Sequence, residues 1–423
     1  MTPDIVEIVR TTRSRIKVDY HQVMGSLTAP EVAARLGVKI DTVYAYVSRG
    51  VLTAHRQDRS RLSRFDSDEV ERLALRGRPR RTSRPAALDV VIETDLTTIV
   101  DQRILYRGRD AGRIAPRKAF EQAAEWLWTG KAIDRLEPWE AYEIPLPELT
   151  DPRDRIRLAV VIAASKEPFR ADLSADAVTS SARSLIATMV AAVPAPADAR
   201  AARLVLGDDR PPLRGSIAGR LWSRLSSTRP TPTLVAALNA ALVLLADHEL
   251  ASSTLAVRVA ASVRADPFAV VIAGLGALAG PLHAGASALA HEMLANASER
   301  TPQAALATAV ERHGHLPGFG HRLYLDGDPR AKLLIEMIAA AAPGAPALHA
   351  ARAVIRAAKQ HARVEPNVDL ALAILSTVAR MPPTAGETIF TVARTSGWIA
   401  HAIEEYSEQP LRFRARAIQR RAR

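Results

Sequence analysis

The stretch FAVVIAGLGALAGPLHAGASALA, residues 268–290, decides how the chain as a whole is interpreted. It is long enough and apolar enough to span a lipid bilayer. Pro281 lies inside it, however, and a proline breaks a continuous helix because it has no amide hydrogen and clashes with the preceding turn. The pattern therefore predicts two buried helices joined by a tight turn, and we expect no membrane association.

The composition also favours a mainly α-helical protein. The chain has 423 residues, enough for two or three domains, and 48% of them are apolar. Alanine is abundant and aromatic residues make up only 4%, which favours closely packed helices over a β-sandwich. There is no cysteine, which excludes disulfides, thiol catalysis and thiolate metal sites. The first 15 residues lack an apolar core of signal-peptide length, so we expect a cytoplasmic location.

The N-terminal part of the chain has the pattern of a small helix-turn-helix unit. Residues 27–52, LTAPEVAARLGVKIDTVYAYVSRGVL, predict two helices with a turn at Gly37, the second from about Lys39 to Ser48. Residues 54–73, AHRQDRSRLSRFDSDEVERL, predict a basic wing and a third helix capped by Asp66 or Ser67. The order resembles the winged helix-turn-helix of mercury-resistance-type regulators and excisionases, and we assign residues 1–75 to such a domain.

This resemblance implies two sets of DNA contacts. Residues near a groove would be Lys39, Thr42, Tyr44 and Arg49, and residues on phosphates would be Arg56, Arg59, Arg61 and Arg64. The alternative is a unit that serves only for protein contacts. The net charge of +12 attracts polyanions, but it does not distinguish nucleic acid from phosphate-bearing cofactors. Residues 76–86, RGRPRRTSRPA, predict a flexible basic linker.

Four separated stretches in the rest of the chain contain residues suited to catalysis. They are LLADHELASSTLAVRVAAS (residues 244–262), GPLHAGA (280–286), LPGFGHRLYLDGDPRA (316–331) and EPNVDLALAIL (365–375). Taken singly, each has a plain structural interpretation. His248 fits a surface cluster, His283 a hydrogen-bonded core residue, Asp369 a helix cap, and GFGH a turn.

Taken together and in this order, the four stretches resemble the citrate synthase family. The segments ILYRGRDAGRIAPRKAFEQAAEWLWTG (104–130) and TVARTSGWIAHAIEE (391–405) are also similar to that family, so the resemblance runs from about Ala87 to Arg416. It implies an all-helical two-domain body and a homodimer. The large domain would comprise residues 87–283 and 381–423, and the small domain, residues 284–380, would close over the substrates.

The resemblance implies a Claisen-type condensation of acetyl-CoA with oxaloacetate, followed by thioester hydrolysis to citrate and CoA. No metal and no cofactor beyond the CoA substrate is implied. Asp369 would remove a methyl proton from acetyl-CoA, His283 would hydrogen-bond the thioester oxygen, and His321 would act on the ketone oxygen of oxaloacetate.

The resemblance also implies residues that bind the two substrates. The carboxylates of oxaloacetate would be held by His248, Arg330, Arg394 and, from the C-terminal tail of the neighbouring subunit, Arg414. The residues that contact the CoA nucleotide would be Leu316, Gly318, Phe319, Gly320 and Asn367. Arginines suit a dicarboxylate because a guanidinium group can bind a carboxylate through two parallel hydrogen bonds.

Elementary chemistry agrees with this division of roles. A thioester methyl group is a far weaker acid than a carboxylic acid, so Asp369 can deprotonate it only if the developing enolate oxygen is stabilised at the same moment. His283 would do this. If a helix begins near Ala284, its dipole lowers the imidazole pKa, and the neutral ring can donate a hydrogen bond.

The sequence departs from the family pattern at three places, and it leaves two rival functions open. Ala284 replaces a glycine, Ala251 and Ser252 stand where an asparagine is usual, and Ala415 disturbs an arginine–proline pair. One rival is a 2-methylcitrate synthase that uses propionyl-CoA. The other is a DNA-binding regulator whose synthase-like body only senses CoA esters or oxaloacetate.

Overall fold

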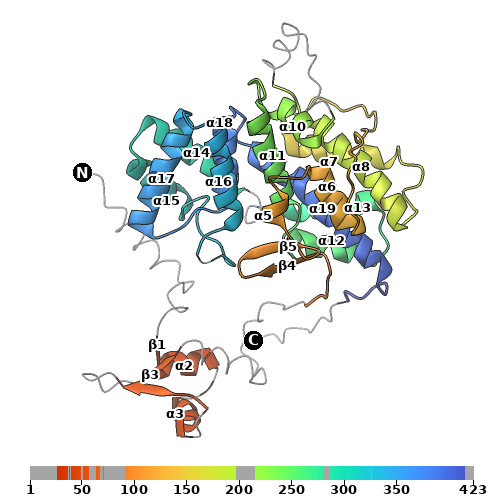
Figure 1. The fold of residues 1–423 in the computed structure, drawn as a ribbon. Coiled ribbons are helices and arrows are strands. Elements are labelled where there is room, and N and C mark those ends of the chain that lie inside the picture. Colours follow the sequence, from red (N-terminus) through yellow and green to blue (C-terminus); the bar gives the residue numbers. More distant parts are fainter. Residues whose placement is uncertain are drawn as a thin grey trace. The chain divides into compact units, whose positions relative to one another are not determined.

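The computed structural model describes residues 26–36, 38, 40–48, 51–56, 63–66, 70, 91–196, 215–280, 285–324 and 326–414. The chain divides into two compact units, with the boundary between Glu93 and Thr94 (Figure 1). Among the described residues, no helix is long and apolar enough to cross a membrane.

The N-terminal unit contains two short helices and a small sheet. Its elements are β1 (Ser26–Thr28), α2 (Ala29–Leu36), α3 (Ile40–Ser48), β2 (Ala54–Arg56) and β3 (Ser63–Asp66). The strands are antiparallel in the order β1-β3-β2, so β2 and β3 flank the expected basic wing. Residues 57–62 of that wing and, except for Val70, the residues of the expected third helix lie outside the described residues. Val32, Val43 and Phe65 are fully buried between the helices and the sheet. Both helices lie where the sequence places them. Strand β1 was not predicted.

The second unit, the body, is helical apart from one small antiparallel sheet. The sheet consists of β4 (Thr97–Val100), β5 (Arg103–Tyr106) and β6 (Arg109–Asp110). The helices are α5 (Ala111–Ile114), α6 (Phe120–Thr129), α7 (Pro152–Ala164), α8 (Ala175–Ala192), α10 (Ile217–Leu225), α11 (Pro232–Leu245), α12 (Ser252–Ser262), α13 (Pro267–Leu278), α14 (Ala286–Glu299), α15 (Pro302–His313), α16 (Pro329–Ala341), α17 (Pro346–Ala362), α18 (Val368–Val378) and α19 (Ala385–Ser407). A mainly helical fold is thus confirmed.

The helices of the body form two groups. Helices α14 to α18 pack on one another, and α19 packs against α6, α8, α11, α12 and α13 in the other group. Figure 1 shows these groups side by side, with α11 and α16 where they meet. The break at Pro281 has the predicted effect, since α13 ends at Leu278 and α14 begins at Ala286. Residues 281–284 lie outside the described residues.

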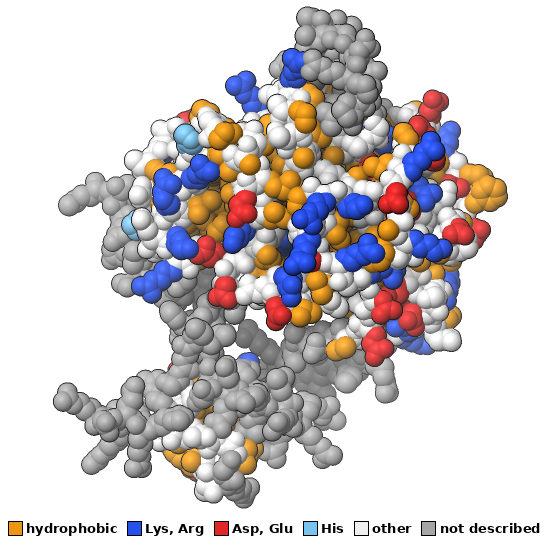
Figure 2. Space-filling view, viewed as in Figure 1, with side chains coloured by type: hydrophobic (Ala, Val, Ile, Leu, Met, Phe, Trp, Pro, Cys, Tyr) orange, Lys and Arg blue, Asp and Glu red, His pale blue; other side chains and the backbone are white. Residues whose placement is uncertain are grey.

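Close packing around α19 depends on glycine. A Cβ atom on Gly274 of α13 would lie 2.8 Å from the indole ring of Trp398, so only glycine lets these two helices approach so closely. At the surface, Figure 2 shows lysine and arginine side chains spread over the visible face of the body, with apolar side chains between them. On that face the positive charge does not form one compact patch.

Candidate active site

His248 lies in the turn between α11 and α12, and the turn is held through its neighbours. The hydroxyl of Tyr106 donates to the carbonyl of Val243 at 2.9 Å and accepts from the amide of Asp247 at 3.3 Å. Glu249 has a φ of 52°, a left-handed conformation that is strained for a residue with a side chain. Its carboxylate accepts from the amide of Ile99 at 3.0 Å, which holds the strained residue in place.

Helix α19 covers the same turn from its buried side. The amide of Gly397 donates to the carbonyl of Ala246 at 3.0 Å. A Cβ atom on Gly397 would lie 2.6 Å from Oδ1 of Asp247 and would also collide with the Ala246 carbonyl. The position of His248 therefore depends on glycine in the SGW sequence of α19.

The ring of His248 faces two aromatic side chains from the loop before α16. Its Nε2 lies 2.9 Å from the hydroxyl of Tyr324, and its ring centroid lies 5.6 Å from that of His321. Burial lowers the pKa of His248, and the charges of Arg330 and Arg394 lower it further. The ring is therefore neutral at physiological pH.

Both ring nitrogens of His321 face a donor, and the shorter contact, from a backbone amide, favours one tautomer. The backbone amide of Leu323 donates to Nδ1 at 3.1 Å, so in the neutral ring Nδ1 carries the lone pair and Nε2 carries the hydrogen. Burial and the charge of Arg330 lower the pKa of His321, which keeps the ring neutral. Nη2 of Arg330 lies 3.3 Å from Nε2, and a guanidinium can only donate. Two donors thus lie side by side, where one oxygen atom could accept from both.

Arg330, in the first turn of α16, is buried and paired with Asp328. Its Nε donates to Oδ1 at 2.9 Å and its Nη2 to Oδ2 at 2.8 Å, which is a two-point pair. Oδ2 also accepts from the amide of Val368 at 3.1 Å, which ties α16 to the start of α18. Burial lowers the pKa of Arg330, but the Asp328 carboxylate outweighs burial and raises it, so the guanidinium stays charged.

Arg394, in the middle of α19, is only 2% exposed and lacks such a partner. Its Nε donates to the carbonyl of Leu245 at 3.0 Å, at the end of α11. In the described parts of the chain no carboxylate forms an ion pair with it. Burial lowers the pKa of Arg394, because a buried guanidinium without a bonded anion is costly. An anionic ligand would relieve that cost.

Asp369 is the second residue of α18 and does not cap the helix. The cap is Asn367, whose Oδ1 accepts from the amides of Asp369 at 3.0 Å and Leu370 at 3.4 Å. Burial raises the pKa of Asp369 to about 6, against the opposing effect of the Arg330 charge. A carboxylate with a pKa near neutrality is suited to act as a general base.

The loop 316–320 is fixed against the residues that precede α18. Phe319 and Pro366 form an antiparallel bridge, and the amide of Gly320 donates to the carbonyl of Glu365 at 2.9 Å. Gly318 has a φ of 79°, and a Cβ atom on it would lie 2.8 Å from that of Leu370. This glycine is required both by its backbone conformation and by the close approach to α18.

The side chains of this loop leave a limited choice for ligand contacts. The Nδ2 of Asn367 donates to the carbonyl of Gly320 at 2.9 Å, so both ends of the amide are used within the protein. Leu316 and Phe319 are half-buried and Gly320 is exposed. Contacts to a ligand would therefore come from the backbone and the apolar side chains rather than from the asparagine.

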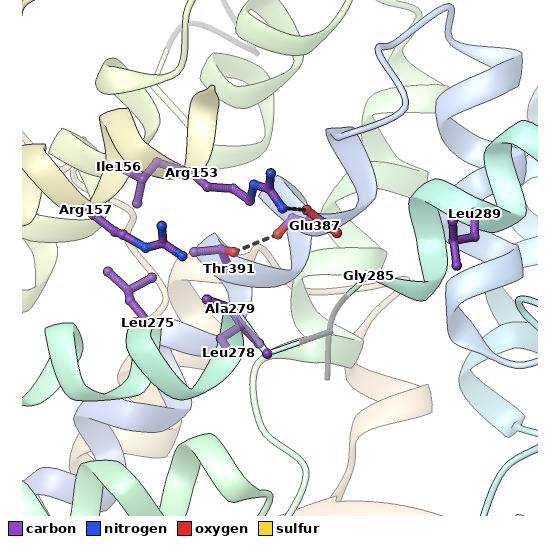
Figure 3. A pocket seen from close by; sticks show the side chains of 11 residues that line it. Arg153, Ile156, Arg157, Leu275, Leu278, Ala279, Gly285, Leu289, Glu387 and Thr391 are labelled. Carbon is purple, nitrogen blue, oxygen red and sulfur yellow. Dashed lines mark hydrogen bonds and ion pairs between the residues drawn. The ribbon is translucent and has the colours of Figure 1, made fainter. Parts of the chain in front are cut away.

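A separate cavity of about 300 Å³ lies between α7, α13, α14 and α19 (Figure 3). Leu275 and Leu278 line it, and Arg153 pairs with Glu387 across 3.4 Å. Gly285, which follows the segment with His283, lines it too. The charge of Glu387 contributes to the raised pKa of Asp369, so the cavity lies close to the expected base.

The structure brings together five of the residues expected in the site: His248, His321, Arg330, Asp369 and Arg394. His283 lies outside the described residues. Arg414 is exposed at the end of the described tail. Of the expected DNA contacts, Lys39, Arg49, Arg59 and Arg61 lie outside the described residues, as do the side chains of Arg56 and Arg64.

Sequence reasoning missed three residues that organise the site: Tyr106, Tyr324 and Asp328. Tyr324 and Asp328 stand in the same stretch as His321 and Arg330. The partner of Tyr324, His248, lies 76 positions away and could not be inferred from the sequence. Asp328 pairs with Arg330 only two residues later, so this local pairing was open to sequence analysis and was overlooked. Among the described residues, no group of three or more histidine, aspartate or glutamate side chains could hold a metal ion.

The family model described as the citrate synthase C-terminal domain matches residues 88–416, and a helix-turn-helix domain model matches residues 26–78. Citrate synthase 2 of Bacillus subtilis is 28% identical over 343 residues, covering 76% of this chain and 91% of its own. The 2-methylcitrate synthase 1 of Corynebacterium glutamicum is 25% identical, covering 73% and 87%.

Solved structures show the same fold. Citrate synthase from Thermoplasma acidophilum, in a ternary complex with carboxymethyl coenzyme A and oxaloacetate, has a TM-score of 0.63 and 25% identity, covering 80% of this chain and 96% of that chain. Citrate synthase from Thermotoga maritima has a TM-score of 0.61 and 23% identity, covering 79% and 95%. The second of these bears on the fold alone.

Proposed function

The chain belongs to the citrate synthase family and is an enzyme of the citrate synthase type, and on this premise we propose that it condenses acetyl-CoA with oxaloacetate to give citrate and CoA. The observation that carries the proposal is the convergence of neutral imidazoles and buried guanidinium groups beside a carboxylate whose pKa is raised to about 6. The imidazole and guanidinium groups can donate hydrogen bonds to oxaloacetate, and the carboxylate can act as a base on acetyl-CoA.

Oxaloacetate would bind between the two helix groups of the body. Arg394 has no carboxylate partner among the described residues, so it would take one carboxylate, and Arg330 and His248 would take the other. The ketone oxygen would accept from Nε2 of His321, the tautomer that the Leu323 contact to Nδ1 favours. Polarising the ketone in this way makes its carbon an electrophile.

Asp369 would then act on the acyl-CoA. Its carboxylate would remove a proton from the methyl carbon while a donor stabilises the enolate oxygen, the role expected of His283. The nucleophilic carbon attacks the polarised ketone, and water then cleaves the thioester and releases CoA. The loop 316–320 would meet the CoA nucleotide through its backbone groups and through Leu316 and Phe319.

We also propose a division of labour between domains. Residues 87–283 and 381–423 would form the large domain and residues 284–380 the small domain. The packing of α14 to α18 on one another supports this division. Closure of one on the other would exclude water from the enolate.

A homodimer would complete the site. Val161 of α7, Val263 directly after α12, and Ile272 of α13 are 51%, 55% and 39% exposed, although they are apolar. Such exposure supports contact with a second copy. Arg412 pairs with Glu405, which lies about three helical turns beyond Arg394 along α19. The described tail is therefore held away from the site of its own chain. Arg414 would therefore serve the neighbouring subunit.

The helix-turn-helix unit would bind DNA through α3. Tyr44 is 48% exposed on this helix and is available for contact with bases. Because phosphate contacts release counterions, binding to DNA should weaken steeply as salt is raised.

The decisive experiment measures release of free CoA thiol from acetyl-CoA and, separately, propionyl-CoA in the presence of oxaloacetate. We expect the higher kcat/KM with acetyl-CoA. A clear preference for propionyl-CoA would instead make the protein a 2-methylcitrate synthase, the activity named for one of its relatives. No thiol release with either, together with salt-sensitive binding to one DNA sequence, would favour a regulator.

A further inference from the structure

A buried hydrogen-bonded network lies beneath the His248 turn. Its centre consists of Arg258 of α12 and His401 of α19, both with fully buried side chains. Nε of Arg258 donates to Nδ1 of His401 at 3.0 Å. Since a guanidinium only donates, Nδ1 carries the lone pair and Nε2 the hydrogen in the neutral ring. Nε2 then donates to Oδ2 of Asp247 at 3.1 Å.

Asp247 is the residue directly before His248, and the network determines where it lies. Its side chain is 1% exposed. Burial raises the pKa of Asp247, but His401 and Arg394 outweigh burial and hold that pKa below its usual range. The buried carboxylate is therefore ionised, and it needs the donor that His401 supplies.

The other two nitrogens of Arg258 bind two glutamates near the end of α19. Nη1 donates to Glu405 at 2.9 Å, and Nη2 pairs with Glu404. The carboxylate of Glu404 accepts from the amide of Asp95 at 3.0 Å, where the body begins. The carboxylate of Glu405 accepts from Nε of Arg412 at 2.7 Å, two residues before Arg414. Through these partners, the Arg258 guanidinium is connected to the turn that carries His248, to Asp95 and to Arg412.

We propose that Arg258 and His401 are positioning residues for the dicarboxylate site. They hold Asp247, and through the backbone they hold His248 toward His321 and Arg330. This inference rests on the proposed function for the identity of the ligand, oxaloacetate. A buried charged network often adds little net stability, because desolvation offsets the attraction between its charges. The geometry it imposes on His248 is therefore its main effect.

The test replaces the ring of His401. His401→Leu keeps the side-chain volume but removes both hydrogen bonds. We expect the KM for oxaloacetate to rise about tenfold, since a hydrogen bond to a charged group is lost, while the KM for acetyl-CoA changes less than twofold. His401→Gln restores the wild-type KM, because its amide offers one acceptor and one donor. His291→Leu, which removes a histidine bonded to Ser376 outside this network, serves as the matched control.

A second variant covers the case in which His401→Leu does not fold. Arg258→Lys keeps a positive charge for Glu404 and Glu405 but has no Nε donor for His401. We expect a similar rise in the KM for oxaloacetate. An unchanged KM in both variants, or a defect in His401→Gln as large as that in His401→Leu, overturns the proposal.

Calorimetric titration with oxaloacetate separates this proposal from the proposed function. If the wild type binds oxaloacetate but releases no CoA, the proposed function fails, and the dissociation constants of the variants still test the network. If the wild type turns over normally and His401→Leu binds oxaloacetate equally well, only the network proposal fails.

Discussion

The two histidines that face each other in the site are held in different ways. His248 stands on a turn fixed from its buried side by Tyr106, Gly397 and the Asp247–His401 pair. His321 stands in the loop before α16, where Leu323, the donor to its ring, is itself 52% exposed. The turn is part of the packed core of one helix group, whereas the loop lies at the edge of the other.

This contrast separates binding from chemistry. Groups on the turn side, His248 and Arg394, have positions that depend on close packing, so changes beneath them should alter stability and the affinity for oxaloacetate. On the loop side, burial raises the pKa of Asp369 to about 6, which suits a base, and His321 offers a neutral donor, so changes there should alter the rate of the chemical step.

The largest effect is expected for Asp369→Asn. Loss of the general base should lower kcat by about 10³-fold while the KM for oxaloacetate stays close to the wild-type value. Thiol release under saturating substrates measures this. Asp176→Asn is the matched control, because Asp176 is also the second residue of its helix, α8, and is exposed. A small change in kcat for Asp369→Asn would show that the base lies elsewhere.

The pH dependence of kcat/KM tests the same residue without a mutation. The base must be ionised, and burial raises the pKa of Asp369 to about 6. Activity should therefore be level above pH 6 and fall about tenfold for each pH unit below it. A profile that stays level down to pH 4.5 would contradict the raised pKa.

Asp369→Asn should lower activity but raise the stability of the fold. A carboxyl pKa that is higher in the folded than in the unfolded chain means that ionisation costs stability above pH 6, and the cost disappears below about pH 4. Asp369→Asn should thus raise the free energy of unfolding at pH 7 by on the order of 2 kcal/mol. Urea unfolding at pH 7 and pH 4 measures this, and the gain should be absent at pH 4.

On the turn side, we expect a substitution at Gly397 to lower the stability of the fold. A methyl group there would collide with Asp247 and the Ala246 carbonyl, so Gly397→Ala should lower the free energy of unfolding by about 2 kcal/mol or more. Gly276→Ala in α13 is the control, since its Cβ would meet no atom within 4 Å. That change should leave stability equal or slightly higher, because alanine favours helix over glycine. Equal stabilities of the two variants would mean that the turn tolerates displacement.

Features encoded by short-range patterns could be predicted from the sequence. The helix break at Pro281, the helices of the N-terminal unit and the stretches that contain His248, His321, Arg330, Asp369 and Arg394 all follow from spacing, turn chemistry or motif resemblance. The outcome for residues 365–369 shows the limit of such patterns. Asn367 caps α18, so the carboxylate of Asp369 is left for other contacts.

Features that depend on distant partners could not be predicted. The hydroxyl of Tyr106 meets Asp247, and Arg258 meets His401 more than 140 positions along the chain. Neither Tyr106 nor Arg258 lies close in the sequence to the residue that it contacts, so no local pattern indicates either contact. The β4–β6 sheet was missed for a related reason, because its strands are only two to four residues long and lie in a chain that is otherwise helical.

The smallest effect is expected where the two sides touch. The hydroxyl of Tyr324 lies 2.9 Å from Nε2 of His248, and burial raises the pKa of that hydroxyl to about 12, so it remains protonated. Tyr324→Phe keeps the buried ring and removes one hydrogen bond, which should raise the KM for oxaloacetate about fivefold with kcat within twofold. Tyr142→Phe, which removes a hydroxyl bonded to Glu167, is the control. If the KM is unchanged, the turn alone orients His248 and the loop side contributes nothing to it.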